Sequence, residues 1–167
     1  VVEVTDNPID IGSYNFIAND QTISRISVSG NNWGRVRIGY HGVVQVGVDD
    51  ALPTDSAVEI GIYRDGNGTL DLYGHNQTIA GLFSSYEGDR RVVNSGGGTP
   101  TLTINNSADY SFPGILGKSG QDSFNLVKSG SGSMTLEGDN TYAGTTTVDG
   151  GTLVIDGSLS AGGRAVT

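Results

Sequence analysis

Two carboxylates stand out as candidates for chemistry in a chain that is otherwise poor in reactive side chains. Glu59 and Asp71 each lie at the middle of a short alternation of apolar residues. If these alternations are consecutive strands, both carboxylates point outward and lie about 5 Å apart. A pair at that distance suits glycosidic hydrolysis or calcium binding. The plainer interpretation, which we favour, is that both carboxylates are solvated, so the sequence predicts no catalytic residue and no metal site.

The other reactive residues form no recognisable constellation. The chain contains no Cys, which removes disulfides, thiolate metal sites and cysteine nucleophiles. His41 and His75 lie in unrelated turns, without the His/His or His/carboxylate spacing of a metal site. Asp49 and Asp50 precede Pro53 closely and are expected to shape a turn. We therefore expect no cofactor and no enzyme activity.

Aromatic side chains offer a second kind of site, because their faces can stack on sugar rings. The candidates for such glycan contacts are Trp33, Tyr40, Tyr63 and Tyr73. Tyr63 and Tyr73 directly follow apolar strand residues and are expected to stack on neighbouring coils of the fold. Aromatic rings stack more often on one another than on ligands. An aromatic row along one exposed face would favour carbohydrate binding, whereas three or more converging charged groups would favour an enzyme.

Composition excludes several classes of partner. The chain has 167 residues, a net charge of −9 and an isoelectric point of about 4.3. This charge repels the phosphates of nucleic acids and the headgroups of anionic lipids. No apolar run approaches the roughly 18 residues of a membrane helix, so we expect no membrane insertion by this segment. The chain opens at Val1 without an initiator Met or a signal peptide, and we expect a mature product or a portion of a longer protein.

The elements that must position these residues are short strands. Apolar residues recur at every second position, and no window shows the spacing of an amphipathic helix. The alternations begin about every ten residues and are separated by glycine-rich turns. A sandwich of hairpins and a solenoid both produce this rhythm, and connections as long as the strands favour the solenoid. We expect about twelve stacked coils, roughly 55–60 Å long at the usual rung spacing. The expected core contains Val46, Ile60, Leu70, Leu72, Leu102, Ile104, Leu136, Val148 and Leu153.

Equivalent positions of different coils are expected to stack. Thr103, Thr135 and Thr147 each lie between apolar neighbours, and the pattern predicts an outward threonine ladder. Asn76 and Asn140 lie in turns of similar sequence. A buried asparagine at a coil corner satisfies backbone groups that a tight bend leaves unpaired, so we expect this role for both.

The C-terminal third carries the most specific pattern. Its signature positions are Gly130, Gly132, Leu136, Gly138, Asn140, Thr141, Tyr142, Gly144, Thr146, Val148, Gly151 and Leu153. With these residues, segment 126–157 closely resembles the autotransporter-associated β-strand repeat. A second stretch, 68–82, resembles the segment that commonly precedes such repeats, although Tyr73 replaces the small or polar residue usual there. Residues 1–50 resemble the family only in rhythm.

The resemblance implies a right-handed parallel β-helix, exported to the cell surface or the medium and often part of a very long repetitive protein. We expect one β-helix domain over residues 1–167, as a fragment of such a passenger protein. The expected function is an extracellular structural or adhesive scaffold. A carbohydrate-binding surface is the first alternative, and a polysaccharide lyase or hydrolase is the second. The expected partners are neighbouring repeats or copies of the chain, assembled end to end into fibres, and cell-surface glycans.

Overall fold

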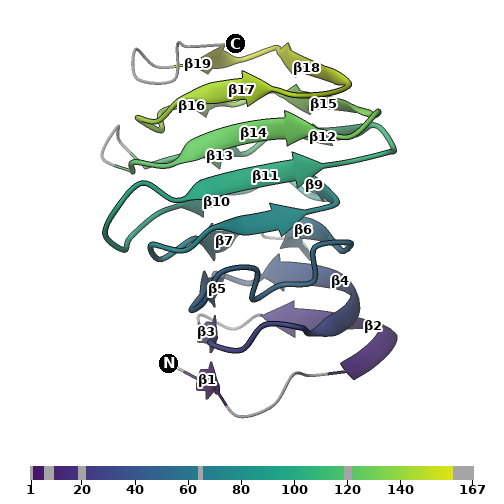
Figure 1. Ribbon diagram of the computed structural model, residues 1–167, viewed down its shortest axis with the longest axis vertical. Helices are drawn as coiled ribbons and strands as arrows, with labels where there is room; N and C mark the ends of the chain where they lie inside the picture. Colours follow the sequence, from purple (N-terminus) through teal and green to yellow (C-terminus); the bar gives the residue numbers. More distant parts are fainter. Residues whose placement is uncertain (1, 6–9, 19–21, 64–65, 119–121, 160–167) are drawn as a thin grey trace.

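The structure is a computed structural model that describes residues 2–5, 10–18, 22–63, 66–118 and 122–159, with only the backbone described for 10–17. Every paired strand within these ranges runs parallel to its neighbours. The described residues contain no helix, so no helix among them could span a membrane. The chain winds into a parallel β-solenoid, as the sequence predicted (Figure 1).

The strands form three long sheets and two short ones. Sheet A contains β1 (Val2–Val4), β3 (Ile23–Ile26), β5 (Gly42–Val46), β7 (Gly68–Asp71), β10 (Arg90–Val93) and β13 (Ile115–Leu116). Sheet B contains β2 (Asp10–Ala18), β4 (Asn32–Gly39), β6 (Ala57–Ile62) and β9 (Gly81–Phe83). Sheet C contains β8 (Gln77–Ile79), β11 (Thr101–Asn105), β14 (Asn125–Ser129) and β17 (Thr146–Val148).

The short sheets continue two sides of the solenoid. Sheet D contains β12 (Tyr110–Phe112), β15 (Ser133–Leu136) and β18 (Thr152–Ile155), and β12 lies against β9 of sheet B. Sheet E contains β16 (Asp139–Asn140) and β19 (Ser158–Leu159), and β16 lies against β13 of sheet A. From β7 onward each coil therefore carries three strands. Between β3 and β4, and between β5 and β6, a loop takes the place of the sheet C strand.

The number of coils differs from the expected twelve. The solenoid has about six turns, since one turn takes more than twenty residues in most of the chain. Leu102, for example, pairs with Leu126, 24 residues further along. The spacing of ten residues counts strands, and each turn holds two or three of them. At the usual rung spacing of about 4.8 Å the six turns span about 30 Å, half the expected length.

The core follows the predicted alternation. Seven of the nine predicted core residues have no exposed surface: Val46, Ile60, Leu70, Leu72, Leu102, Ile104 and Leu136. The other two, Val148 and Leu153, are only half-buried. They lie in β17 and β18, the outermost described strands of sheets C and D, so no described strand stacks beyond them.

A threonine ladder is present, but its residues differ from those that the sequence predicted. Thr78, Thr103 and Thr147 occupy one column of sheet C, interrupted by Val127. Thr135 lies in sheet D, where it pairs with Ser111 and Val154. The expected single ladder of Thr103, Thr135 and Thr147 is therefore wrong for Thr135, because strands of similar sequence lie on different sides of the solenoid.

Candidate functional site

Glu59 and Asp71 do not form the pair that the sequence suggested. Glu59 lies in β6 of sheet B, whereas Asp71 ends β7 of sheet A. The expectation that both are solvated is also wrong, because their exposed fractions are only 2% and 3%. Each carboxylate is a separate buried group, and each needs its own partners.

Glu59 is held by two arginines and a serine. Its Oε2 lies 2.8 Å from Nε of Arg37 and 3.6 Å from Nη1 of Arg35. The hydroxyl of Ser85 donates a hydrogen bond to Oε1. Desolvation raises the pKa of Glu59, but the hydrogen bonds from Ser85 and Arg37 and the charges of both arginines outweigh it, so the pKa falls below its usual value. A carboxylate that is ionised and neutralised in this way is a poor proton donor and offers no free ligand to a metal.

Asp71 accepts four hydrogen bonds from three other residues. Its Oδ2 accepts from Nε2 of Gln45 (2.9 Å) and Oγ of Ser95 (2.6 Å). Its Oδ1 accepts from the backbone N–H groups of Tyr73 (3.0 Å) and Ser95 (2.9 Å). Gln45 and Ser95 belong to the coils on either side, so the carboxylate joins three coils. Among the described residues, no group of three or more His, Cys, Asp or Glu side chains could hold a metal ion.

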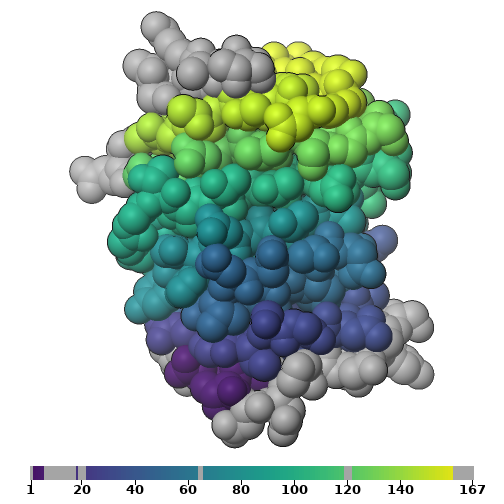
Figure 2. Space-filling model, viewed as in Figure 1, coloured from purple at the N-terminus to yellow at the C-terminus, as the bar shows by residue number. Residues whose placement is uncertain are grey.

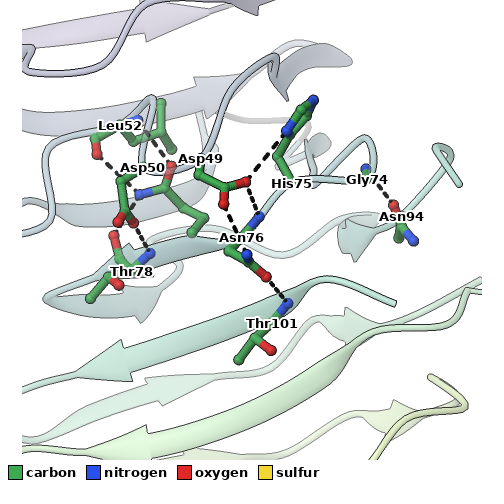
Figure 3. Close-up of polar contacts among 10 residues, drawn as sticks. Asp49, Asp50, Leu52, Gly74, His75, Asn76, Thr78, Asn94 and Thr101 are labelled. Atoms are coloured by element: carbon green, nitrogen blue, oxygen red, sulfur yellow. Dashed lines mark hydrogen bonds and ion pairs between the residues drawn. The ribbon is translucent and has the colours of Figure 1, made fainter. Parts of the chain in front are cut away.

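The turn at Asp49 and Asp50 forms as predicted and covers the first strand of sheet C. Figure 3 shows the two carboxylates reaching the next coil, where Oδ1 of Asp49 accepts from the backbone of Asn76 (3.0 Å) and Oδ1 of Asp50 accepts from that of Thr78 (2.8 Å). Nδ1 of His75 lies 3.4 Å from Oδ1 of Asp49. Hydrogen bonds to Asn76 lower the pKa of Asp49. Loop 47–56 thus takes the place of a strand beneath β8.

The aromatic candidates lie in different environments. Trp33 is buried, with 2% of its surface exposed. Tyr40 and Tyr63 stack on each other across neighbouring coils, with ring centroids 4.7 Å apart. The guanidinium of Arg25 lies 4.3 Å from the ring centroid of Tyr73. The expected stacking is therefore confirmed for Tyr63 and not seen for Tyr73. Glycan contact at the exposed edges of Tyr40 and Tyr63 stays a prediction.

Asn140 has the predicted role of a buried corner amide. It is 1% exposed, and its Oδ1 accepts a hydrogen bond from the backbone N–H of Leu116 in the preceding coil (3.0 Å). Its Nδ2 donates to the carbonyl of Gly138 in its own turn (2.8 Å) and to that of Ser158 in the next coil (3.2 Å). One amide therefore satisfies backbone groups of three consecutive coils.

Asn76 is exposed, so it is not the predicted buried amide, although its Oδ1 accepts a hydrogen bond from the backbone N–H of Thr101 in the next coil (2.8 Å) and its Nδ2 donates to Asp49 (3.0 Å). The neighbouring Gln77 is buried instead, and its amide exchanges two hydrogen bonds with the backbone of Leu52 (2.9 and 3.0 Å). Sequence reasoning also missed three further buried amides at corners: Asn31, Asn94 and Asn106.

The glycines of the repeat lie where consecutive coils touch. A Cβ on Gly144 would overlap the backbone carbonyl of Phe124 in the coil before it. Gly130 has a φ of 76°, in the left-handed region that favours glycine, and a Cβ there would overlap the carbonyl of Asn106. These two positions therefore exclude side chains for reasons of space and, at Gly130, of backbone conformation as well.

Tyr142 and Thr146 complete the repeat in the core. The ring of Tyr142 is 1% exposed and stacks on Phe124, with centroids 5.0 Å apart. Its hydroxyl forms a hydrogen bond with that of Thr146, which has no exposed surface. Desolvation raises the pKa of Tyr142. The backbone of Thr141 donates to the carbonyl of Leu116 (2.8 Å), which continues the contact that Asn140 begins.

Lys128 is a buried cation that sequence reasoning missed. It occupies an inward column of sheet C between Ile104 and Val148 and has no exposed surface. Its Nζ donates to the carbonyls of Ser129 (2.6 Å), Gly130 (3.2 Å) and Gly150 (3.1 Å). Desolvation lowers the pKa of Lys128. The sequence did indicate this burial, because Lys128 lies two residues after Leu126 in the same strand and therefore points to the same, inward side.

These features define a parallel β-solenoid whose buried polar groups join one coil to the next. Residues 126–155 match the family model described as passenger-associated-transport-repeat. This match confirms the resemblance to the autotransporter repeat that the sequence suggested for this part of the chain. Neither the curated proteins nor the solved structures yield a match.

Replacing Asn140 by Ala tests the corner amides. The variant leaves the buried N–H of Leu116 and two carbonyls without their partner, so we expect the free energy of unfolding to fall by about 2–4 kcal/mol. Asn105→Ala is the matched control, since Asn105 is exposed and should change stability by less than about 0.5 kcal/mol. Urea unfolding followed by circular dichroism measures both. Equal stabilities of the two variants would contradict the corner role.

Glu59 should make stability depend on pH in mild acid. The pKa of Glu59 is below its usual value of 4.5, so its contacts stabilise the protein above this pH and are lost as the pH falls through the folded-state pKa. We expect Glu59→Gln to cost about 1–3 kcal/mol at neutral pH and to approach the unaltered protein in acid. Glu87→Gln is the control, because Glu87 is exposed. Parallel stability curves for Glu59→Gln and the unaltered protein would contradict this assignment.

Proposed function

We propose that the chain is an extracellular scaffold, part of the β-helical passenger of a secreted or surface-exposed bacterial protein. The observation that carries this proposal is the passenger-associated repeat at residues 126–155, folded as consecutive coils of the solenoid. In this segment the signature residues Asn140 and Tyr142 are both buried and bonded. The signature residues of this motif therefore contribute to the stacking of coils, which fits a structural role. Adhesion would then depend on the side chains that point outward.

The contacts of the two candidate carboxylates support the same proposal. Glu59 is neutralised by Arg35 and Arg37, and Asp71 accepts four hydrogen bonds. A polysaccharide lyase or hydrolase needs an acid and a base that are free to reach the substrate. Both carboxylates instead hold neighbouring coils together.

Assays for polysaccharide cleavage test the scaffold proposal against the enzyme alternative. The purified protein, incubated with neutral and acidic polysaccharides, should release neither reducing ends nor unsaturated products. Glu59→Gln and Asp71→Asn are the variants for comparison, because they alter the two carboxylates that the sequence first suggested as candidates for catalysis. Reproducible cleavage that both variants abolish would overturn the scaffold proposal in favour of an enzyme.

We also propose that the neighbours of this segment along the solenoid axis are further repeats or copies of the same chain. The support lies in β17 and β18, the outermost described strands of sheets C and D. Val148 and Leu153 point inward from these strands and are only half-buried. A further coil stacked on them would cover both side chains and pair the outer edges of both strands. Copies stacked in this way form an open, fibre-like assembly.

Amide hydrogen exchange along β17 and β18 tests the stacking proposal. In a longer protein that contains this segment, the outward-edge amides of both strands should exchange about as slowly as those of β14. In the 167-residue chain they should be protected only at concentrations where sedimentation shows association. Fast exchange of these amides in the longer protein would contradict the proposal.

A further inference from the structure

The outward face of sheet C differs from those of sheets A and B. The outward side of sheet A carries Arg25 and Arg91, and that of sheet B carries Arg35 and Arg37, whereas the outward carboxylates Asp71 and Glu59 are covered by their neighbours. Sheet C presents hydroxyl, amide and small apolar side chains, and two aspartates lie at its margin: Asp149 directly after β17 and Asp55 in the loop beside β8. We call this surface, the outward side of β8, β11, β14 and β17, the neutral face, and its central residues are Thr78, Thr103, Asn105, Val127 and Thr147.

The neutral face is hollowed along one side. An open groove is lined by Thr78 and Asn105 of the face, by Thr54 and Asp55 below it, and by the turn residues Ser107 and Ser131. These residues come from four successive coils, so the groove runs along the solenoid axis and crosses the strands. Sheet C lies on the side nearest the viewer in Figure 1, and Figure 2 shows the surface of that side.

We propose that the neutral face binds an uncharged polysaccharide whose chain lies along this groove. The groove offers hydroxyls and amides from each coil, at a repeat of about 4.8 Å. A linear polysaccharide presents hydroxyl groups at a comparable repeat, so successive sugar units can bond to successive coils. Because the groove is open and extends over several coils, it suits a polymer better than a small molecule.

Charge selects an uncharged ligand over the alternatives. The margin of the neutral face carries Asp55 and Asp149, and the whole chain has a net charge of −9. An acidic polysaccharide or a nucleic acid would therefore be repelled. No aromatic side chain of the described residues lines the groove, so the polysaccharide would bind through hydrogen bonds, without the ring stacking that the sequence suggested for glycan contacts. This proposal adds a ligand to the scaffold and does not depend on the scaffold being part of a passenger protein.

Binding to a panel of soluble polysaccharides tests the proposal. The probes are galactomannan and mixed-linkage β-glucan, which are neutral, and polygalacturonate, which is acidic. Affinity electrophoresis and titration calorimetry should show binding of at least one neutral probe and none of the acidic one. The combined substitution Thr78→Val with Asn105→Ala removes two hydrogen-bonding groups from the lining of the groove and should weaken binding about tenfold.

Thr135→Val provides the matched control, since Thr135 is an equally placed outward threonine of sheet D. It should leave the affinity unchanged, and circular dichroism should show that all variants keep the fold. Three outcomes would overturn the proposal: no binding of either neutral probe, equal binding by the face variant and the control, or binding of polygalacturonate alone. Self-association abolished by the face variant, without glycan binding, would assign the face to a second copy of the chain instead.

Discussion

The whole solenoid depends on satisfying the backbone at the corners between its sheets. Within a sheet, each coil bonds to the next through the parallel ladder, but at a corner the chain turns and its N–H and C=O groups lose these partners. Buried amide side chains fill the gap. The Nδ2 groups of Asn31, Asn94, Asn106 and Asn140 each donate once within their own turn and once to a carbonyl of the next coil. Without such side chains, stacking would bury unpaired backbone groups at these corners, at a cost of about 1–3 kcal/mol each.

The corner constraint also explains two of the buried charged residues, Asp71 and Lys128. Asp71 bonds to the coils on both sides, and the ammonium of Lys128 bonds to carbonyls of its own coil and the next. Both groups replace backbone pairing where the ladder ends. Their burial is tolerated because several hydrogen bonds compensate the lost solvation. Because these hydrogen bonds are all made within the protein, neither Asp71 nor Lys128 has hydrogen-bonding capacity left for a substrate or a metal.

The sequence predicted correctly which strand residues face the core. It did not predict how many strands make up one turn of the solenoid. Alternation placed Leu70, Leu102 and Leu136 in the core, because inward and outward positions alternate within one strand whatever the architecture. It could not tell whether the next strand starts a new coil or turns a corner of the same coil, so the coil count was doubled. Thr135 was assigned to the column of Thr103 for the same reason. Long-range register is set by the corners, and a single sequence carries little information about it.

The candidate site shows the same division between local and long-range information. The corner role of Asn140 was predicted because its turn has a recognisable sequence pattern. The equivalent role of Gln77 was missed because it depends on the loop at Leu52 in the previous coil. Glu59 and Asp71 were paired because they look equivalent within their own strands, yet they lie on different sheets. A residue's local pattern therefore indicates whether it faces in or out, and the coils above and below decide what it does there. For a solenoid of this kind, the outward residues without partners in neighbouring coils remain available for binding, and on sheet C these residues are almost all uncharged.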